Sequence, residues 1–380
     1  MNVLFISNDP SIFLEESSAR LRMREYAEAV SKIGGTLHVL SAGNVTENFV
    51  EGSLHLYARQ ATRVMRVFVL TSQAKKILRN TQIDVVSCQD PFEHGLIGLL
   101  AVRNTSSKLH IQVHTDFLSP WFTQDSIYRS PRVRMPRLNK VRVRLADYTL
   151  VRASGIRTVS HRVKESLMKK YETTIVEPSV IPIFVSQVLC LPVPLPPDSR
   201  TFTLLVASRL EPEKRIQDIL AAVARIHVQY PSLALLIAGS GSERKNLENM
   251  ANKLGIEDRV IFLGHRNDVR GLMQNAHSFI QTSAYEGYGI TLIEAALAGC
   301  PIITSDVGIV GEVFVGYEDV LAAPVGDPIN FAAHTAWLIE DQFARKDLAK
   351  NAKAKVLAHL HSIKNKPSDI IADIQKTIIV

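Results

Sequence analysis

Residues 202–214 read FTLLVASRLEPEK, an unbroken apolar run followed at once by a charged loop. A short continuous apolar segment is typical of a strand that is buried on both faces, as in a parallel sheet covered by helices. Ligands of open α/β sheets bind beyond the carboxyl ends of such strands. The strand therefore predicts an α/β fold, and the loop that follows it lies where a binding site is expected.

Short apolar strands alternate with amphipathic helical stretches along the whole chain, the pattern of parallel sheets with helices on both faces. The first half predicts strands at Val3–Ser7, Leu37–Ser41, Val85–Cys88, Leu109–His114 and Tyr148–Val151, and helices at Ala19–Ser31, Ala61–Arg79 and Arg162–Lys170. The second half predicts strands at Phe202–Ala207, Ala234–Ala238, Val260–Phe262, Phe279–Gln281 and Ile302–Thr304. We therefore expect an α/β protein with two doubly wound halves.

A proline-rich stretch separates the two halves. Six prolines between Pro178 and Pro197 remove backbone donors and disfavour regular structure. The predicted segments are an N-terminal domain at 1–177, a linker at 178–200, a C-terminal domain at 201–355, and a helical tail at 356–380 that could pack back on the N-terminal domain. A length of 380 residues and a hydrophobic content of 46% suit two cores.

The composition points to the cytoplasm. The apolar run after Met1 lacks a basic leader, and no later apolar stretch approaches membrane-spanning length. The cysteines Cys88, Cys190 and Cys300 are odd in number and have no metal-like spacing. We therefore expect a soluble protein of a reducing compartment.

The net charge of +7 is unevenly distributed, since residues 1–195 hold 25 Lys and Arg against 16 Asp and Glu. The densest basic run comprises Arg129, Arg132, Arg134, Arg137, Lys140, Arg142 and Arg144. Such a run could contact anionic lipid at the inner face of the cell membrane or a phosphorylated acceptor, and it is equally consistent with a solvated helix face. No zinc-ligand spacing or RNA-binding signature accompanies it, so we expect no nucleic-acid partner.

The loop Ser208–Lys214 carries two cations that could reach a pyrophosphate. Arg209 offers a fork of donors and Lys214 a point charge. Taken alone, this loop is also consistent with two surface cations at a helix entrance.

A second motif, Tyr285–Ala296, follows the predicted strand Phe279–Gln281 and leads into an apolar helix. Its glycines let the backbone pass close to a ligand, and the amides at the helix start can hold a diphosphate. Glu286 and Glu294 are eight residues apart and could each address one end of a nucleotide sugar. The structural alternative is a simple turn followed by a satisfied helix polar residue.

These motifs resemble glycosyltransferase family 4, a family of retaining enzymes with the GT-B fold. The resemblance rests on the Ser-Arg-Leu-x-x-x-Lys loop and the Glu-x₇-Glu element, and it covers nearly all of 201–327. Further matching segments are Ile237–Gly241, Val260–His265, Pro301–Asp306, Gln89–Phe92, His114–Thr115 and Val159–Val163. It implies two Rossmann-like domains that face each other across a cleft.

The resemblance also implies roles by position. Arg209 and Lys214 would hold the diphosphate, and Glu286 would bind hydroxyls of the transferred sugar. The donor-binding residues would be Gly239, Gly241, His265, Arg266, Gly287, Tyr288, Gly289, Ile290, Thr291 and Glu294, with Glu294 on the ribose. His114 would face the sugar, although a histidine after a strand is more often structural.

Two positions depart from the family pattern. The loop after the first strand, Asn8–Phe13, lacks the glycine pair that many members carry, which leaves the acceptor contacts open. The usual Gly-Gly after the strand near 304 is replaced by Val307–Glu312, in which we expect Gly308 to preserve the tight turn.

The sequence predicts a retaining transfer of a hexosyl-type group from a nucleotide diphosphate sugar to an acceptor hydroxyl. No Asp-x-Asp motif stands out as a metal clamp, so we expect Arg209, Lys214 and helix amides to stabilise the leaving diphosphate without a metal or another cofactor. The alternatives are a nucleotide-sugar epimerase of similar architecture and a non-catalytic sugar-nucleotide-binding or scaffold protein. The sequence does not identify the sugar, the base, the acceptor or the oligomeric state.

Overall fold

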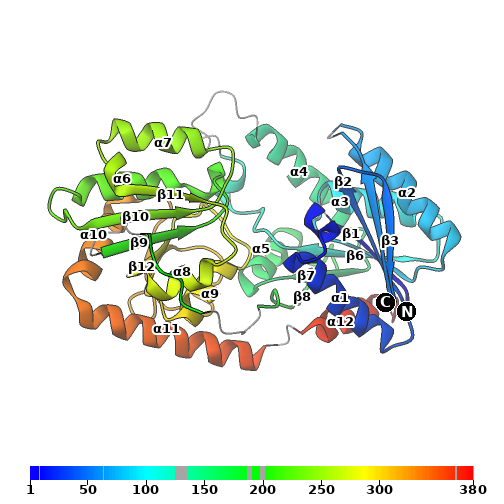
Figure 1. Cartoon of the computed structure of the whole chain (residues 1–380). Helices are drawn as coiled ribbons and strands as arrows, with labels where there is room; N and C mark the ends of the chain where they lie inside the picture. Colours follow the sequence, from blue (N-terminus) through cyan, green and yellow to red (C-terminus); the bar gives the residue numbers. More distant parts are fainter. Residues whose placement is uncertain are drawn as a thin grey trace. The chain divides into compact units, whose positions relative to one another are not determined.

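The structure is a computed structural model that describes residues 1–7, 9–62, 64–124, 135–185, 191–196, 202–363 and 366–379. The described chain forms two compact units. The N-terminal unit contains residues 1–118, 135–184 and 366–379, and the C-terminal unit contains residues 119–124 and 185–363. Figure 1 shows the elements of each unit.

The described part of the N-terminal unit has an eight-stranded sheet in the order β3-β4-β2-β1-β5-β6-β7-β8. Its strands are β1 (Val3–Ser7), β2 (Leu37–Gly43), β3 (Glu47–Glu51), β4 (Leu54–Gln60), β5 (Val85–Cys88), β6 (Lys108–Val113), β7 (Gly155–Thr158) and β8 (Ser179–Val180). Neighbouring strands pair in parallel apart from the antiparallel edge pair of β3 and β4. The central strand β1 is buried over its whole length, as expected for a sheet that helices cover.

Six helices belong to this unit: α1 (Ser18–Ser31), α2 (Arg66–Asn80), α3 (Glu93–Val102), α4 (Met135–Leu150), α5 (His161–Tyr171) and α12 (Pro367–Ile379), counted over the described residues. Serine hydroxyls cap the N-termini of two of these helices. Ser17 accepts a hydrogen bond from the amide of Arg20 at the start of α1, and Ser160 accepts one from the amide of Val163 at the start of α5. The helix α12 packs against α1 (Figure 1). Its apolar face, which includes Ile370 and Ile374, joins the same core as Val3.

The described part of the C-terminal unit has a six-stranded sheet in the order β11-β10-β9-β12-β13-β14, with parallel pairs throughout. The strands are β9 (Phe202–Ala207), β10 (Leu233–Ala238), β11 (Val260–Gly264), β12 (Ser278–Gln281), β13 (Ile302–Ser305) and β14 (Leu321–Ala323). The α-helices are α6 (Ile216–Ile226), α7 (Arg244–Lys253), α8 (Val269–Asn275), α9 (Ile290–Ala298), α10 (Pro328–Glu340) and α11 (Gln342–Ser362). Short 3-10 turns are η1 (Pro10–Phe13) in the N-terminal unit, and η2 (Pro120–Phe122), η4 (Pro212–Lys214) and η5 (Glu257–Arg259) among the described residues of the C-terminal unit.

The structure confirms the predicted strands except Tyr148–Val151, which was wrong. That segment falls at the end of α4 and just beyond it. The buried residues Asn139, Ala146 and Leu150 recur at helical spacing, whereas Tyr148 is exposed, so burial along α4 follows one face of a helix. A four-residue apolar run without its longer context cannot distinguish the two structures.

The segment boundaries differ from the sequence-based ones in three places. The strand β8 lies inside the predicted linker 178–200 and adds to the N-terminal sheet. Residues 119–124 belong to the C-terminal unit although they fall within the predicted N-terminal domain. In the predicted tail, the end of α11 belongs to the C-terminal unit, and α12 belongs to the N-terminal unit.

The basic run lies only partly within the described residues, because Arg129, Arg132 and Arg134 fall outside them. On α4, Arg142 pairs with Glu93, whereas Arg137, Lys140 and Arg144 are exposed. None of the described helices is long and apolar enough to cross a membrane.

Candidate functional site

The C-terminal sheet has one topological switch point. From β9 the chain adds β10 and β11 on one side and then returns to place β12 on the other side of β9. The carboxyl ends of β9 and β12 are therefore the place where a ligand of this sheet is expected. The loops that leave these two ends are the two motifs singled out from the sequence.

One ion pair joins the two loops. Nζ of Lys214 lies 2.5 Å from Oε1 of Glu286, and both side chains are less than one-fifth exposed. The same carboxylate oxygen accepts a hydrogen bond of 2.8 Å from the hydroxyl of Ser283. The fold thus places a cation and a carboxylate together, although 72 residues separate them in the chain.

Backbone bonds hold this pair in place. The amide of Ala284 donates to the carbonyl of Glu213, and the hydroxyl of Thr282 donates to the carbonyls of Lys214 and Arg215. Arg215 itself has a left-handed φ of 50° and pairs with Asp218 in the buried first turn of α6. These bonds are to main-chain carbonyls, so they fix where the backbone of Lys214 lies and do not involve its ammonium group.

Arg209 differs from Lys214 in exposure. Its side chain is 72% exposed, and Nη2 lies 2.9 Å from Oε1 of Glu213. An exposed arginine side chain is flexible, so Arg209 can turn toward an anion at a low cost in free energy. The loop therefore presents one held cation and one exposed cation.

The glycines of the loop after β10 allow two backbones to pass in direct contact. A Cβ atom on Gly239 would lie 1.8 Å from the carbonyl oxygen of Ser208, and one on Gly241 would lie 2.4 Å from that of Leu210. Leu210 donates its amide to the carbonyl of Ser240, and Gly239 donates to Gly264. These bonds join the loops after β9, β10 and β11, and the three loops together are called the platform below.

The predicted base-flanking residues His265 and Arg266 follow β11. Nε2 of the exposed His265 lies 3.1 Å from the amide oxygen of Asn267, and Arg266 pairs with Asp268 at 2.5 Å. This pairing lowers the pKa of the Asp268 carboxyl. Both predicted residues thus lie at the rim of the platform, each held by a neighbour within its own loop.

The second motif begins the helix α9. Gly287 and Gly289 are buried, and Gly289 has a left-handed φ of 100°, which favours glycine. The first amides of a helix, here those of Ile290 and Thr291, have no acceptor within the helix, and its dipole favours an anion there. The hydroxyl of Thr291 donates to Oε1 of Gln281, which ties the helix start to β12.

Glu294 lies one turn into α9 and pairs with a residue that the sequence reasoning missed. Nε of Arg270, on α8, lies 3.1 Å from Oε1 of Glu294. Burial raises the pKa of the Glu294 carboxyl, and Arg270 opposes that shift. A carboxylate can accept several hydrogen bonds, so Glu294 can accept from hydroxyl groups such as those of a ribose while it pairs with Arg270.

Tyr288 differs from the other predicted donor-binding residues. Its side chain is 2% exposed, and its hydroxyl lies 2.9 Å from Nε2 of His359 on α11. Its carbonyl accepts from the amide of Ile309. The side chain of Tyr288 therefore anchors the loop to α11.

Gly308, in the turn after β13, packs against the loop that carries Glu286 and Tyr288, and its backbone forms the tight turn that the sequence predicts. It has a φ of 62°, and a Cβ atom there would lie 2.5 Å from the carbonyl oxygen of Tyr288 and 3.1 Å from Cβ of Glu286. The turn after β13 thus packs directly on the loop that carries Glu286.

Residues 119–124 bring two further aromatic rings to the C-terminal unit. Phe122 packs edge-on against Tyr285 with ring centroids 5.3 Å apart, and the guanidinium of Arg215 lies 5.5 Å from the ring of Trp121. Sequence position alone assigned this segment to the first domain. The adjacent aromatic residues Trp121 and Phe122 could have indicated that this loop packs against another part of the protein, because aromatic side chains in a loop need an apolar partner.

His114 lies in the N-terminal unit, just beyond the end of β6. Its ring is half-buried, and Nε2 lies 3.1 Å from the amide oxygen of Gln112. Burial, together with the positive charges of Arg157 and Arg22, lowers the pKa of His114 to about 3. The imidazole is therefore neutral at physiological pH.

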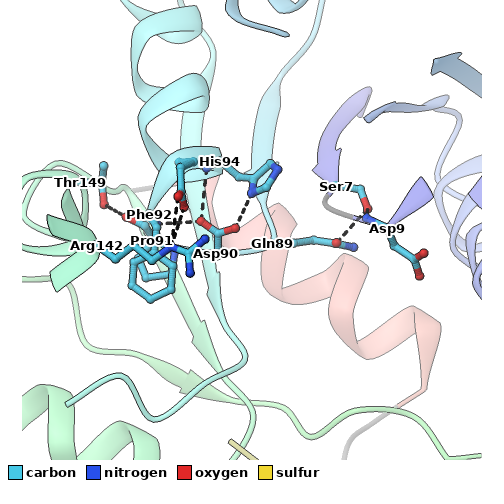
Figure 2. A network of polar contacts seen from close by, with 10 residues as sticks. Ser7, Asp9, Gln89, Asp90, Pro91, Phe92, His94, Arg142 and Thr149 are labelled. Atoms are coloured by element: carbon cyan, nitrogen blue, oxygen red, sulfur yellow. Dashed lines mark hydrogen bonds and ion pairs between the residues drawn. The ribbon is translucent and has the colours of Figure 1, made fainter. Parts of the chain in front are cut away.

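The segment Gln89–Phe92 follows β5, at the switch point of the N-terminal sheet. Figure 2 shows the side chains of Ser7 and Gln89 pointing toward one another, with the hydroxyl 2.8 Å from the amide oxygen. Asp90 accepts from the amides of Phe92 and His94 and pairs with the His94 ring. Asp90 therefore caps the start of α3.

Among the residues that the structure describes, no group of three or more His, Cys, Asp and Glu is arranged to hold a metal ion. The free cysteines Cys88 and Cys300 are buried, and burial raises their pKa values, as is typical of structural thiols.

Two family models match this chain. The model of "Glycosyltransferase Family 4" matches residues 22–186, and that of "Glycosyl transferases group 1" matches residues 192–355. Together they cover the C-terminal sheet and all of the N-terminal sheet except β1. The chain belongs to glycosyltransferase family 4.

Solved structures show that this family 4 protein has the two-domain, Rossmann-like GT-B fold. It is similar to sucrose-phosphate synthase from Thermosynechococcus elongatus, with a TM-score of 0.80 and 18% identity over 100% of this chain and 99% of that one. It is also similar to HepE from Anabaena, solved in complex with UDP and glucose, with a TM-score of 0.72 and 20% identity over 98% of this chain and 99% of that one.

Among curated relatives, glycogen synthase of Mycobacterium tuberculosis is 30% identical over 155 residues, which are 40% of this family 4 protein and 37% of that enzyme. The match thus spans well under half the length of the relative. It supports common descent of the matched region.

Proposed function

We propose that the chain transfers a hexosyl group from a nucleotide diphosphate sugar to an acceptor hydroxyl, with retention of the anomeric configuration and without a metal ion. The observation that carries the proposal is the placement of Lys214, Glu286 and the start of α9 at one switch point. The proposal is strengthened by HepE, a protein of the same fold solved with UDP and glucose, which makes UDP-glucose the first donor to test.

The charges at this switch point match the transition state. Departure of the leaving group builds negative charge on the diphosphate and positive charge on the sugar ring. Lys214, Arg209 and the first amides of α9 would stabilise the diphosphate, and pre-positioned donors of this kind contribute strongly to catalysis. The carboxylate of Glu286 would accept hydroxyl hydrogen bonds from the sugar while it holds Lys214 in place.

The nucleoside end of the donor would lie over the platform of the loops after β9, β10 and β11. The ribose hydroxyls would donate to Glu294, whose carboxylate Arg270 orients. The base would lie between the Gly239–Gly241 loop and His265. Main-chain hydrogen bonds join the loops of that platform, and backbone groups of these loops would contact the base.

The acceptor would lie on an anionic membrane surface, which the exposed face of α4 could contact. Arg137, Lys140 and Arg144 recur at helical spacing, and the exposed apolar residues Val141 and Tyr148 lie between and beyond them. A helix face that combines basic and apolar residues is typical of proteins that lie on anionic bilayers. No ion pair of these three cations is recorded among the described residues.

The test of the proposed activity is product analysis with UDP-glucose in the presence of EDTA, together with calorimetry of UDP binding. Transfer or slow donor hydrolysis with retained configuration supports the proposal. Epimer formation from the donor alone would replace it with an epimerase, and a folded protein that binds no nucleoside diphosphate would contradict it. Co-sedimentation with phosphatidylglycerol vesicles tests the membrane contact, which should weaken on replacing Arg137, Lys140 and Arg144 by Gln.

A further inference from the structure

A buried chain of hydrogen bonds leads from His114 into the N-terminal unit. Nε2 of His114 lies 3.1 Å from Oε1 of Gln112, and Nη1 of Arg157 lies 2.8 Å from the same oxygen. On its other side, Nε2 of Gln112 lies 2.9 Å from the hydroxyl of Ser87. Gln112 and Arg157 are buried, so solvent does not compete for these bonds.

Arg157 determines which way the Gln112 amide points. A guanidinium only donates hydrogen bonds, so the atom of Gln112 that faces it must be the amide oxygen. The reversed amide would set two donors against each other at 2.8 Å in a buried place. Arg157 cannot turn away, because it also donates to the carbonyls of Ile181 and Pro182.

The orientation of Gln112 in turn determines the proton position on His114. Since the amide oxygen is an acceptor, Nε2 of His114 must carry a proton to bond to it. In a neutral ring the other nitrogen, Nδ1, is then an acceptor. No hydrogen bond of Nδ1 is recorded among the residues that the structure describes.

The surroundings keep the ring neutral. Burial and the positive charges of Arg157 and Arg22 disfavour an imidazolium, and His110 acts in the same direction. The nearby carboxylate of Asp90 acts in the opposite direction and is itself paired with His94. The pKa of His114 therefore lies well below 7.

We propose that Arg157 and Gln112 are positioning residues that hold His114 as a neutral imidazole with its proton on Nε2, so that Nδ1 accepts a hydrogen bond from a hydroxyl group of the substrate. The inference rests on the proposed function, because it specifies which group His114 binds. Phosphate oxygens have no proton to donate at neutral pH, so His114 contacts a sugar or acceptor hydroxyl and not the diphosphate.

The first experiment reads the proton position directly, in the unmodified protein. Nitrogen NMR of protein labelled at histidine distinguishes a protonated ring nitrogen from an acceptor nitrogen, and a His114→Gln variant assigns the signal. The expected result at pH 7 is a proton on Nε2 and an acceptor Nδ1, unchanged down to about pH 5. A proton on Nδ1, in either a neutral or a cationic ring, would overturn the inference whatever the activity.

A Gln112→Glu variant tests the positioning role. The carboxylate still accepts from Arg157 and His114, but its charge favours the imidazolium, so the pKa of His114 should rise by a unit or more. The exposed Gln60 provides the matched control, because Gln60→Glu should leave the His114 signal unchanged. An unshifted titration in a folded Gln112→Glu protein would contradict the role.

The second experiment identifies the hydroxyl. His114→Ala should lower kcat/KM about fivefold with UDP-glucose, the loss expected for one hydrogen bond. With one deoxy analogue of the donor, or of the acceptor, the same substitution should have no effect. An equal loss with every deoxy analogue would overturn the hydroxyl contact. If no donor is turned over while Nδ1 is an acceptor, the proposed function fails and the proton assignment stands.

Discussion

The Nζ atom of Lys214 lies 2.5 Å from Oε1 of Glu286, although the two residues come from loops on opposite sides of the switch point between β9 and β12. Neither side chain is fully buried, so an arriving diphosphate could share the ammonium group without first breaking a desolvated pair. The pair thus keeps Lys214 pointed at the site before the donor arrives, which lowers the cost of ordering it later.

Replacing Lys214 by Met should lower kcat/KM about 100-fold, because the variant removes a positive charge at the position where the leaving diphosphate gains negative charge. Steady-state kinetics with UDP-glucose measures the effect. The exposed Lys253 on α7 provides a matched control, since Lys253→Met removes the same charge from the same unit. Equal kinetics of the two variants would remove Lys214 from the mechanism.

Glu294→Gln should weaken UDP binding about tenfold while leaving turnover at saturating donor nearly unchanged. The neutral amide is a poorer acceptor for ribose hydroxyls, and it also loosens the orienting bond from Arg270. Calorimetry with UDP measures the loss. UDP analogues that lack the 2′ or 3′ ribose hydroxyl should bind the variant and the unmodified protein alike. Native UDP affinity in the variant would argue against the ribose role. Glu257→Gln, at an exposed position of the same unit, is the control.

The strands could be predicted from sequence because each is a short buried apolar run between polar loops. Phe202–Ala207 is buried at every position, which is the pattern that periodicity detects best. The predicted strand at 148–151 was wrong because Tyr148 and Leu150 lie in the last turn of a longer helix, where Leu150 is buried and Tyr148 is exposed. The hairpin β3–β4 was missed because β3 is largely exposed and polar.

The candidate site was predictable only as far as its residues lie in short motifs. Lys214 and Glu286 stand in two loops whose order and chemistry are local features of the sequence. Arg270, the partner of Glu294, could not be found in this way, because an ion pair between distant elements depends on packing. The same holds for the bond from Arg157 that orients Gln112, the partner of His114. Tyr288 shows the converse, since its place in a motif does not reveal that its side chain points to α11.

Gly308→Ala should destabilise the protein by about 3 kcal/mol. The variant combines the cost of a left-handed backbone with a clash, because the new Cβ atom would lie 2.5 Å from the carbonyl oxygen of Tyr288. Gly255 has a similar φ of 65° but open space around its Cα, so Gly255→Ala isolates the backbone cost of about 1 kcal/mol. Chemical denaturation of both variants should give a clear difference. Equal losses would mean that the turn after β13 does not press on the Glu286 loop.

Glu51 should make the N-terminal unit sensitive to acid. Hydrogen bonds from Arg20 and Arg24 lower the pKa of the Glu51 carboxyl to about 2, from an ordinary value of 4.5. A depressed folded-state pKa contributes stability that is present above the unfolded value and is lost as the pH falls from about 4.5 toward 2. Glu51→Gln should therefore lower stability at pH 7 and flatten its decline over that range. Unfolding measured between pH 2 and pH 7 tests this.

The matched control for this acid effect is Glu28, which pairs with Lys32 on the surface of α1. Both of those side chains are more than two-thirds exposed, so the solvent screens their interaction. Glu28→Gln should leave both the stability at pH 7 and its pH dependence nearly unchanged. A pH profile of Glu51→Gln that matches the Glu28→Gln profile would mean that the Arg20–Glu51 pair does not contribute.

Asp373→Asn should loosen the C-terminal helix from the N-terminal sheet. Asp373 lies on α12, 3.3 Å from Nε2 of His110, and His110 in turn lies 2.9 Å from the hydroxyl of Ser87. Burial alone would raise the pKa of Asp373, but the bonds from His110 and Ser179 and the charge of Arg157 keep it below its usual value. The carboxylate therefore stabilises the fold above its unfolded pKa, and this contribution is lost as the pH falls.

Asp373→Asn removes that charge, because the amide keeps the shape of the side chain but accepts a weaker bond. We expect a loss of about 1 to 3 kcal/mol at pH 7 and faster hydrogen exchange of the α12 amides than in the remaining helices of the unit. Gln375→Ala, at an exposed position of the same helix, should change neither. Because Ser87 also bonds to Gln112, the variant should broaden the His114 nitrogen signals as well. Unchanged exchange in α12 would mean that apolar packing of Ile370 and Ile374 alone holds the helix.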